Sequence, residues 1–99
     1  MIAVTEHFYL ISYDVRNDRR LRKMHKLLRG YGEWLQLSVF HCRLSRQRLV
    51  RLEAAVRELL DLTEDHVLFV DLGGAEPAAS AVKSLGRTYE PPQRRPVIV

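Results

Sequence analysis

Residues 8–23 read FYLISYDVRNDRRLRK, and this stretch joins a strand pattern to a helix pattern. Residues 8–15 form an aromatic and β-branched run with the length of one strand. Asn17 and Asp18 follow as candidate N-caps of a helix. Hydrophobic residues then recur at helical spacing, at Leu21, Met24, Leu27, Leu28 and Tyr31. The stretch therefore predicts a strand that leads directly into an amphipathic helix.

The segment after this helix predicts a return to extended chain. Gly30 and Gly32 can supply a left-handed C-cap that ends the helix. Residues 34–44 have extended character, either as one long strand or as two strands with a tight bend near Gln36. Within this segment we interpret Cys42 as a small buried hydrophobic residue.

A second helix and a further strand complete the alternation. Ser45 is the next candidate N-cap, and a stripe of Leu and Val residues over 49–60 predicts an amphipathic helix. Residues 66–72, HVLFVDL, predict a strand, and the chain beyond it reads as a connector. Residues 81–85 could form a short strand, and Val97–Val99 could form a terminal one.

The order of these elements predicts an α+β fold, a ferredoxin-like βαββαβ domain with an additional C-terminal strand. We expect residues 1–80 to form this domain and residues 81–99 to form a tail that packs on a partner subunit. The fold stacks both helices on one face of the sheet and leaves the other face open. A second copy of the chain is the simplest cover for that face, so we expect a homodimer.

Strand alternation predicts which side chains of residues 8–15 lie under the helices. One set is apolar throughout and belongs to the core: Tyr9, Ile11, Tyr13 and Val15. Ser12 and Asp14 then lie on the open face. Because a carboxylate is costly to bury alone, we expect Asp14 to meet water, a cation or an arginine.

Composition restricts the class of protein. The chain has 99 residues, a net charge of +4 and a pI near 9.6, which favours one small domain with a polyanionic partner. A single cysteine excludes an intrachain disulfide and fits the reducing cytoplasm. No apolar run is long enough to span a membrane, and the first residues do not resemble a signal peptide.

The charge is concentrated in the middle of the chain. Residues 16–57 hold twelve basic and three acidic side chains, whereas residues 58–76 hold six acidic ones and no Lys or Arg. The positive part begins directly after Asp14, with five basic side chains, at Arg16, Arg19, Arg20, Arg22 and Lys23. A basic surface next to a carboxylate is therefore expected.

This pairing suggests a chemistry. A carboxylate can hold Mg²⁺ or another divalent cation, and arginines bind phosphates through two hydrogen bonds. Together they would place a hydrated cation beside a phosphodiester, as metal-assisted hydrolysis requires. The alternative is that Asp14 pairs with a neighbouring arginine or caps the turn. In a symmetric dimer two copies of Asp14 could face each other across the axis.

The same residues resemble a known family. FYLISYDVRNDRR, the YG at residues 31–32, QLSVF at residues 36–40 and the basic helix from Ser45 are similar to CRISPR-associated protein two of the spacer-acquisition module. The resemblance covers about residues 8–72, and the tail EPPQRRPVIV is also similar to tails of that family. It implies a ferredoxin-like homodimer whose C-terminal strand joins the partner's sheet. It also implies Mg²⁺-dependent endonuclease activity on RNA or DNA, in CRISPR antiviral defense.

The resemblance assigns roles to individual residues. It implies that Asp14 is the catalytic, metal-binding residue and that Arg20, at the start of the first helix, contacts nucleic acid. Arg16, Arg19 and Arg22 are carried over as further nucleic-acid-binding residues.

Three other residues are possible members of this site: Tyr13, Ser38 and Phe40. The two aromatic rings could stack on bases. We prefer core packing for Tyr13, and the sequence leaves Phe40 open between the two roles.

The family also implies alternatives. Its members act with the CRISPR integrase in an adaptation complex, in which such a protein can be a non-catalytic scaffold that bridges integrase dimers and holds prespacer DNA. Toxin-like ribonucleases of the same fold are a further possibility.

Overall fold

The elements follow the expected alternation of strands and helices, with one short extra helix at the end. The computed structural model describes residues 5–86. The elements in this range are β1 (Glu6–Asp14), α1 (Asp18–Arg29), β2 (Gly32–Gln36), β3 (Val39–Ser45), α2 (Arg46–Leu59), β4 (His66–Gly74) and α3 (Ala75–Ala78).

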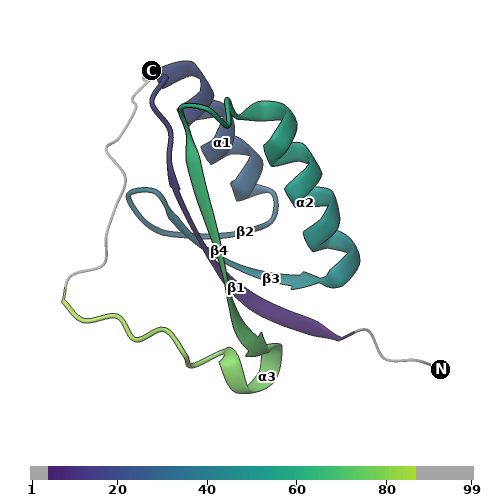
Figure 1. Cartoon of the computed structure of the whole chain (residues 1–99). Coiled ribbons are helices and arrows are strands. Elements are labelled where there is room, and N and C mark those ends of the chain that lie inside the picture. The colour runs from purple at the N-terminus through teal and green to yellow at the C-terminus, as the bar shows by residue number, and fades with distance from the viewer. Residues whose placement is uncertain (1–4, 87–99) are drawn as a thin grey trace.

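The four strands form one sheet in the order β2-β3-β1-β4, and every neighbouring pair is antiparallel. Helices α1 and α2 lie side by side against this sheet, and α3 follows the C-terminal end of β4 (Figure 1). This is the ferredoxin-like α+β arrangement that the order of elements predicts. None of the helices in residues 5–86 is long and apolar enough to cross a membrane.

The hydrophobic core lies between the helices and one face of the sheet. Strand β1 and the residue after it contribute Ile11, Tyr13 and Val15, as the alternation predicts. The other elements bury Met24, Leu28, Phe40, Cys42, Leu44, Leu52 and Val56. The core therefore fixes the register of β1, because a shift by one residue would turn its apolar side chains away from the helices.

Two of the three candidate N-caps, Asn17 and Ser45, are confirmed, whereas Asp18 is the first residue of α1. The Asn17 side chain accepts a hydrogen bond from the backbone N–H of Arg20 at 3.0 Å, and α1 begins at the next residue, Asp18. The Ser45 hydroxyl accepts from the backbone N–H of Arg48 at 3.2 Å, and α2 begins at Arg46. Since only residues 15–17 separate β1 from α1, Asp14 lies close to the first turn of the helix.

The prediction of a left-handed glycine C-cap is wrong. Gly30 has a φ of −79°, in the right-handed region, and its N–H donates to the Leu27 carbonyl at 3.1 Å. Gly32 has a different role, which is to let β2 approach β3. A Cβ on Gly32 would overlap the Sγ of Cys42 and lie 2.5 Å from the carbonyl oxygen of His41. Any side chain would therefore push these strands apart.

Residues 34–44 form two strands. The bend lies at Leu37 and Ser38, where Leu37 adopts a left-handed φ of 40°. The indole Nε1–H of Trp34 donates to the Leu37 carbonyl at 2.7 Å and ties the bend to β2.

The end of the described chain differs from expectation. Residues 81–85 form no strand, and the short helix α3 occupies part of the connector instead. The terminal strand at Val97–Val99, and the packing of the tail on a partner, lie outside the described residues and stay predictions.

Candidate metal and nucleic-acid site

Asp14 lies at the exposed end of β1, opposite His66 of β4. Within residues 5–86 its carboxylate has no hydrogen-bond or ion-pair partner, although it is followed by several arginines. Within the described residues, Asp14 therefore neither pairs with a neighbouring arginine nor caps the turn. The carboxylate oxygens of Asp14 are available to a ligand.

Asp65, just before β4, forms an ion pair with Arg20 of α1. Its carboxylate accepts from Arg20 through Nε at 2.7 Å and through Nη2 at 3.1 Å. Nη2 of Arg20 also donates to Glu64 at 3.1 Å. The Asp65 side chain is completely buried, whereas that of Glu64 is exposed.

Two backbone groups complete the surroundings of the Asp65 carboxylate. The N–H of Arg16 donates to Oδ1, and the N–H of Asp61 donates to Oδ2, each at 2.9 Å. The hydrogen bond from Arg20 lowers the pKa of Asp65 far below its usual range, burial opposes this, and the backbone donors add to the lowering. The same pair raises the pKa of Arg20. Asp65 is therefore charged in the folded protein at ordinary pH.

In the sequence Asp65 stands out only as part of an acidic stretch, so its role there was missed. The predicted strand order could have indicated the position of Asp65. Because β1 and β4 are antiparallel neighbours, the residue before β4 must lie beside the residues after β1. A carboxylate at that position meets the cations of the first helical turn.

The predicted nucleic-acid-binding arginines thus divide into two groups. Arg20 is held by Asp65 and Glu64, so the structure gives it a role in joining α1 to the α2–β4 loop. Arg16, Arg19 and Arg22 have exposed side chains, and none forms an ion pair within the described range 5–86. The same is true of Lys23, Lys26 and Arg29 further along α1. An unpaired basic surface therefore begins next to Asp14. We call its members on the first helix the α1 cations: Arg19, Arg22, Lys23, Lys26 and Arg29.

Tyr13 and Phe40 belong to the core. Tyr13 is 5% exposed and Phe40 is fully buried, and their rings stack with centroids 6.3 Å apart. Burial raises the pKa of Tyr13, and a side-chain hydrogen bond with Ser38 partly offsets this. The Tyr13 N–H also donates to the Ser38 carbonyl at 3.1 Å. The prediction that Tyr13 packs in the core is confirmed. Phe40, which the sequence left open between core packing and base stacking, also packs in the core.

Cys42 is fully buried, as expected for a small hydrophobic residue, and burial raises its pKa to about 11. Residues 5–86 contain no group of three or more His, Cys, Asp or Glu side chains that could hold a metal ion. Asp14 therefore stands as a single carboxylate within one copy of the described chain.

Comparison with known proteins places this geometry in context. Residues 7–77 match the family described as CRISPR associated protein Cas2. The chain is 52% identical over 94 residues to the CRISPR-associated endoribonuclease Cas2 of Geobacter sulfurreducens, and the match covers 95% of this chain and 99% of that protein.

Solved structures have the same fold. Streptococcus pyogenes Cas2 superposes with a TM-score of 0.70 and 30% identity, covering 80% of this chain and 99% of that one. A chain of the partial Cas6-RT-Cas1--Cas2 complex superposes with a TM-score of 0.66 and 25% identity, covering 88% of this chain and 95% of that one.

The buried carboxylate predicts a pH dependence of stability. The pKa of Asp65 is lower in the folded chain than its unfolded value of about 3.9, so its stabilising effect is complete above that pH and is lost as the pH falls below it. Asp65→Asn should lower the Tm at neutral pH by roughly 10 °C or more and make stability below about pH 4 depend less on pH.

Thermal unfolding followed by circular dichroism between pH 7 and pH 2 checks this expectation. Glu64→Gln is the matched control, because Glu64 contacts the same arginine from an exposed position, and it should change the Tm by less than about 3 °C. Equal effects of the two substitutions would contradict the role assigned to Asp65.

Proposed function

The chain belongs to the Cas2 family of CRISPR-associated proteins, and on that premise we propose that it binds nucleic acid in CRISPR adaptation and cleaves phosphodiester bonds with the help of a divalent cation. One observation carries the proposal. The carboxylate of Asp14 is exposed and unpaired at the end of β1, directly before a run of unpaired cations on α1. The endoribonuclease name of the Geobacter relative supports the same reaction class.

A divalent cation fits the donor chemistry at Asp14. Mg²⁺ is usually held in proteins by one or two carboxylates together with water and substrate phosphates. Asp14 supplies one such carboxylate, and no side chain of residues 5–86 forms an ion pair with it. When bound there, Mg²⁺ would polarise the phosphodiester and lower the pKa of a coordinated water.

The chain's own residues then bind and orient the substrate. Arg16, Arg19 and Arg22 would contact phosphates on either side of the scissile bond, with two hydrogen bonds from each guanidinium where the geometry allows. The N-terminal end of α1 carries a partial positive charge, which favours an anion in the same region. Such contacts recognise the backbone that RNA and DNA share, so we propose a phosphodiester of either nucleic acid as substrate.

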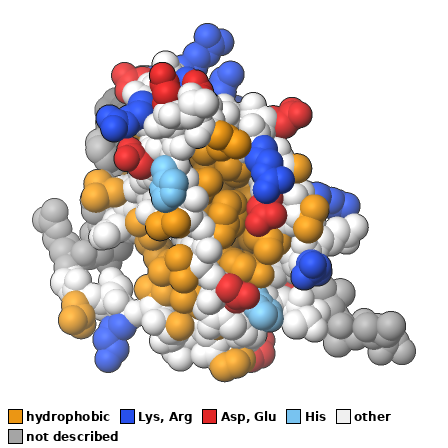
Figure 2. All heavy atoms as spheres, viewed as in Figure 1, with side chains coloured by type: hydrophobic (Ala, Val, Ile, Leu, Met, Phe, Trp, Pro, Cys, Tyr) orange, Lys and Arg blue, Asp and Glu red, His pale blue; other side chains and the backbone are white. Residues whose placement is uncertain are grey.

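We also propose a homodimer that covers the open face of the sheet. Leu68 and Val70 of β4 are 50% and 45% exposed, and Leu10 of β1 pairs with Val70 in the same register. Figure 2 shows hydrophobic side chains collected in the middle of one view, with most Lys and Arg side chains nearer its margin. A second copy would bury this apolar surface and bring a second Asp14 to the assembly.

The integrase is the further partner that we propose. The support is the similarity to a chain found in a complex with Cas1. Binding and cleavage are separable properties of this chain, because Asp14 and the α1 cations are different side chains. A scaffolding role in the adaptation complex needs the cations and the dimer, whereas cleavage also needs the carboxylate.

Asp14→Asn should abolish Mg²⁺-dependent cleavage of short RNA and DNA substrates while leaving their binding affinity within about twofold. The substitution removes the charge that holds the cation but leaves the α1 cations in place. Gel-based cleavage assays measure the loss of activity, and fluorescence anisotropy measures the binding affinity. Asp18→Asn is the matched control, and cleavage that persists in Asp14→Asn would contradict the role of Asp14.

Substituting Arg19 and Arg22 together by Gln should weaken binding to all sequences alike. Removing one phosphate contact should reduce the slope of log affinity against log salt by about one. The double variant Arg51→Gln and Arg57→Gln is the matched control, because both side chains are exposed on α2 and form no ion pair in the described range. Equal reductions in affinity for the two variants would assign binding to net charge and not to α1.

Leu68→Asp should shift the protein from dimer to monomer in sedimentation equilibrium, because it places a charge in the apolar face that we expect a second copy to cover. Leu62→Asp is the matched control. Leu62 is similarly exposed, at 59%, but lies in the loop before β4. Dissociation by both substitutions, or by neither, would argue against this interface.

A further inference from the structure

A pocket lies between α1 and β2, and of its lining residues only Arg29, one of the α1 cations, has been considered so far as part of the nucleic-acid site. His25 and Arg29 of α1 and Gly32 and Trp34 of β2 form its walls. Its volume is about 310 Å³, which lies at the lower end of the range for ligand pockets. We propose that this pocket binds one unpaired nucleotide of a single strand, an inference that rests on the proposed function.

One wall of the pocket is an aromatic ring held in place. The Trp34 indole donates to the Leu37 carbonyl at 2.7 Å, and the His25 ring meets it edge-on at a centroid distance of 5.3 Å. His25 is itself positioned by an edge contact with the buried Phe40, at 5.2 Å. A ring fixed in this way can stack on a nucleobase without a further ordering cost.

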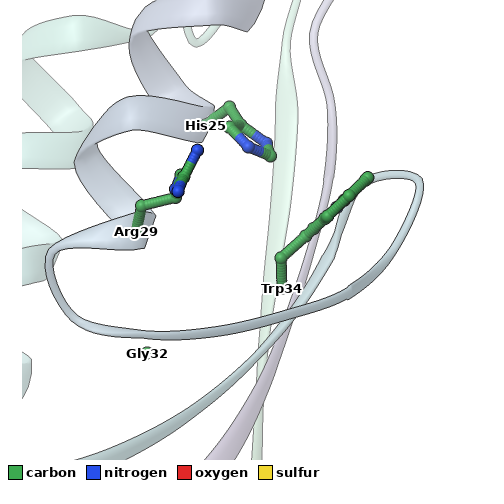
Figure 3. A pocket seen from close by; sticks show the side chains of 4 residues that line it. All are labelled: His25, Arg29, Gly32 and Trp34. Atoms are coloured by element: carbon green, nitrogen blue, oxygen red, sulfur yellow. The ribbon is translucent and has the colours of Figure 1, made fainter. Parts of the chain in front are cut away.

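The charge of the pocket fits a phosphate. Arg29 is exposed and forms no ion pair within residues 5–86, and Figure 3 shows His25 and Arg29 projecting from α1 beside the space that Trp34 bounds. None of the four lining residues is acidic. Glu33 alternates to the other face of β2, and Asp18 lies eleven residues before Arg29, about 16 Å along the helix axis.

The cations on α1 connect the pocket with Asp14. Arg22, Lys26 and Arg29 follow one another at spacings of four and three residues, so they share one face of the helix with His25. The helix is 12 residues long, or about 18 Å. A strand whose phosphates follow this row would place one base at Trp34 and another segment near Asp14.

The proposal predicts a preference for unpaired nucleotides. In a duplex each base is stacked and paired, so its face is not accessible to an indole ring, whereas a single strand can turn a base outward. The shared chemistry is a base with its phosphate. It could come from RNA or from a single-stranded DNA segment.

The chain contains a single tryptophan, so its intrinsic fluorescence reports on the pocket directly. Titration of the full chain with oligothymidylate or oligouridylate should quench Trp34 emission saturably. A blunt duplex and an abasic oligonucleotide of the same length carry phosphates without an accessible base, and they should bind without this quenching. The relative response to the two homopolymers distinguishes DNA from RNA as the source of the nucleotide.

Two substitutions test the contacts. Arg29→Gln should weaken oligothymidylate binding about fivefold and duplex binding by less, because Arg29 is one of the α1 cations and also lines the pocket. Arg57→Gln on α2 is the charge-matched control. Trp34→Leu should weaken single-strand binding about tenfold, as expected from the removal of one base stack, with duplex binding unchanged. If Trp34→Leu does not fold, Arg29→Gln at its exposed position still decides the question.

The outcomes separate this proposal from the function on which it rests. Equal quenching by the abasic and base-containing strands, or equal effects of Arg29→Gln and Arg57→Gln, would overturn the pocket and leave nucleic-acid binding intact. Absence of binding to every probe would overturn both. A Trp34 emission that ignores oligonucleotides but changes when residues 87–99 are deleted would assign the pocket to the chain's own tail and overturn the proposal.

Discussion

The buried ion pair between Asp65 and Arg20 is the constraint on which the arrangement of the site depends. A buried carboxylate is tolerated only when its oxygens are fully hydrogen-bonded, and here both Arg20 and two backbone N–H groups supply donors. Those donors come from the β1–α1 loop, from the first turn of α1 and from the α2–β4 loop. One side chain therefore joins the α2–β4 loop to the β1–α1 loop and the first turn of α1, at sequence separations of 49 and 45 residues, and fixes where α1 begins relative to the end of β1.

This pairing also explains how neighbouring arginines acquire different roles. Arg20 is partly buried and paired with Asp65, whereas Arg19 and Arg22 are exposed and form no ion pair within residues 5–86. Asp65 engages Arg20, and no cation of residues 5–86 forms an ion pair with Asp14.

Local patterns in the sequence predicted those parts of the fold that local physics determines. The alternation around Tyr13 placed β1 correctly against the helices, and Asn17 and Ser45 were recognisable as caps because capping involves only three or four neighbouring residues. Gly32 was misassigned because its constraint is a close approach to Cys42 on another strand. Asp65 was missed for the same reason, since the pairing of β1 with β4 is what brings it beside Arg16 and Arg20.

Helix α1 joins two kinds of recognition that differ in what they can discriminate. In the proposed function the cations along its surface act on phosphates, which every nucleic acid carries, so they would supply affinity and position without reading sequence. The ring of Trp34 at the other end acts on the face of a base, and every base has such a face. Neither contact distinguishes one base from another, but the second requires a base that is unpaired. A chain built in this way would select the strandedness of its ligand and not its sequence.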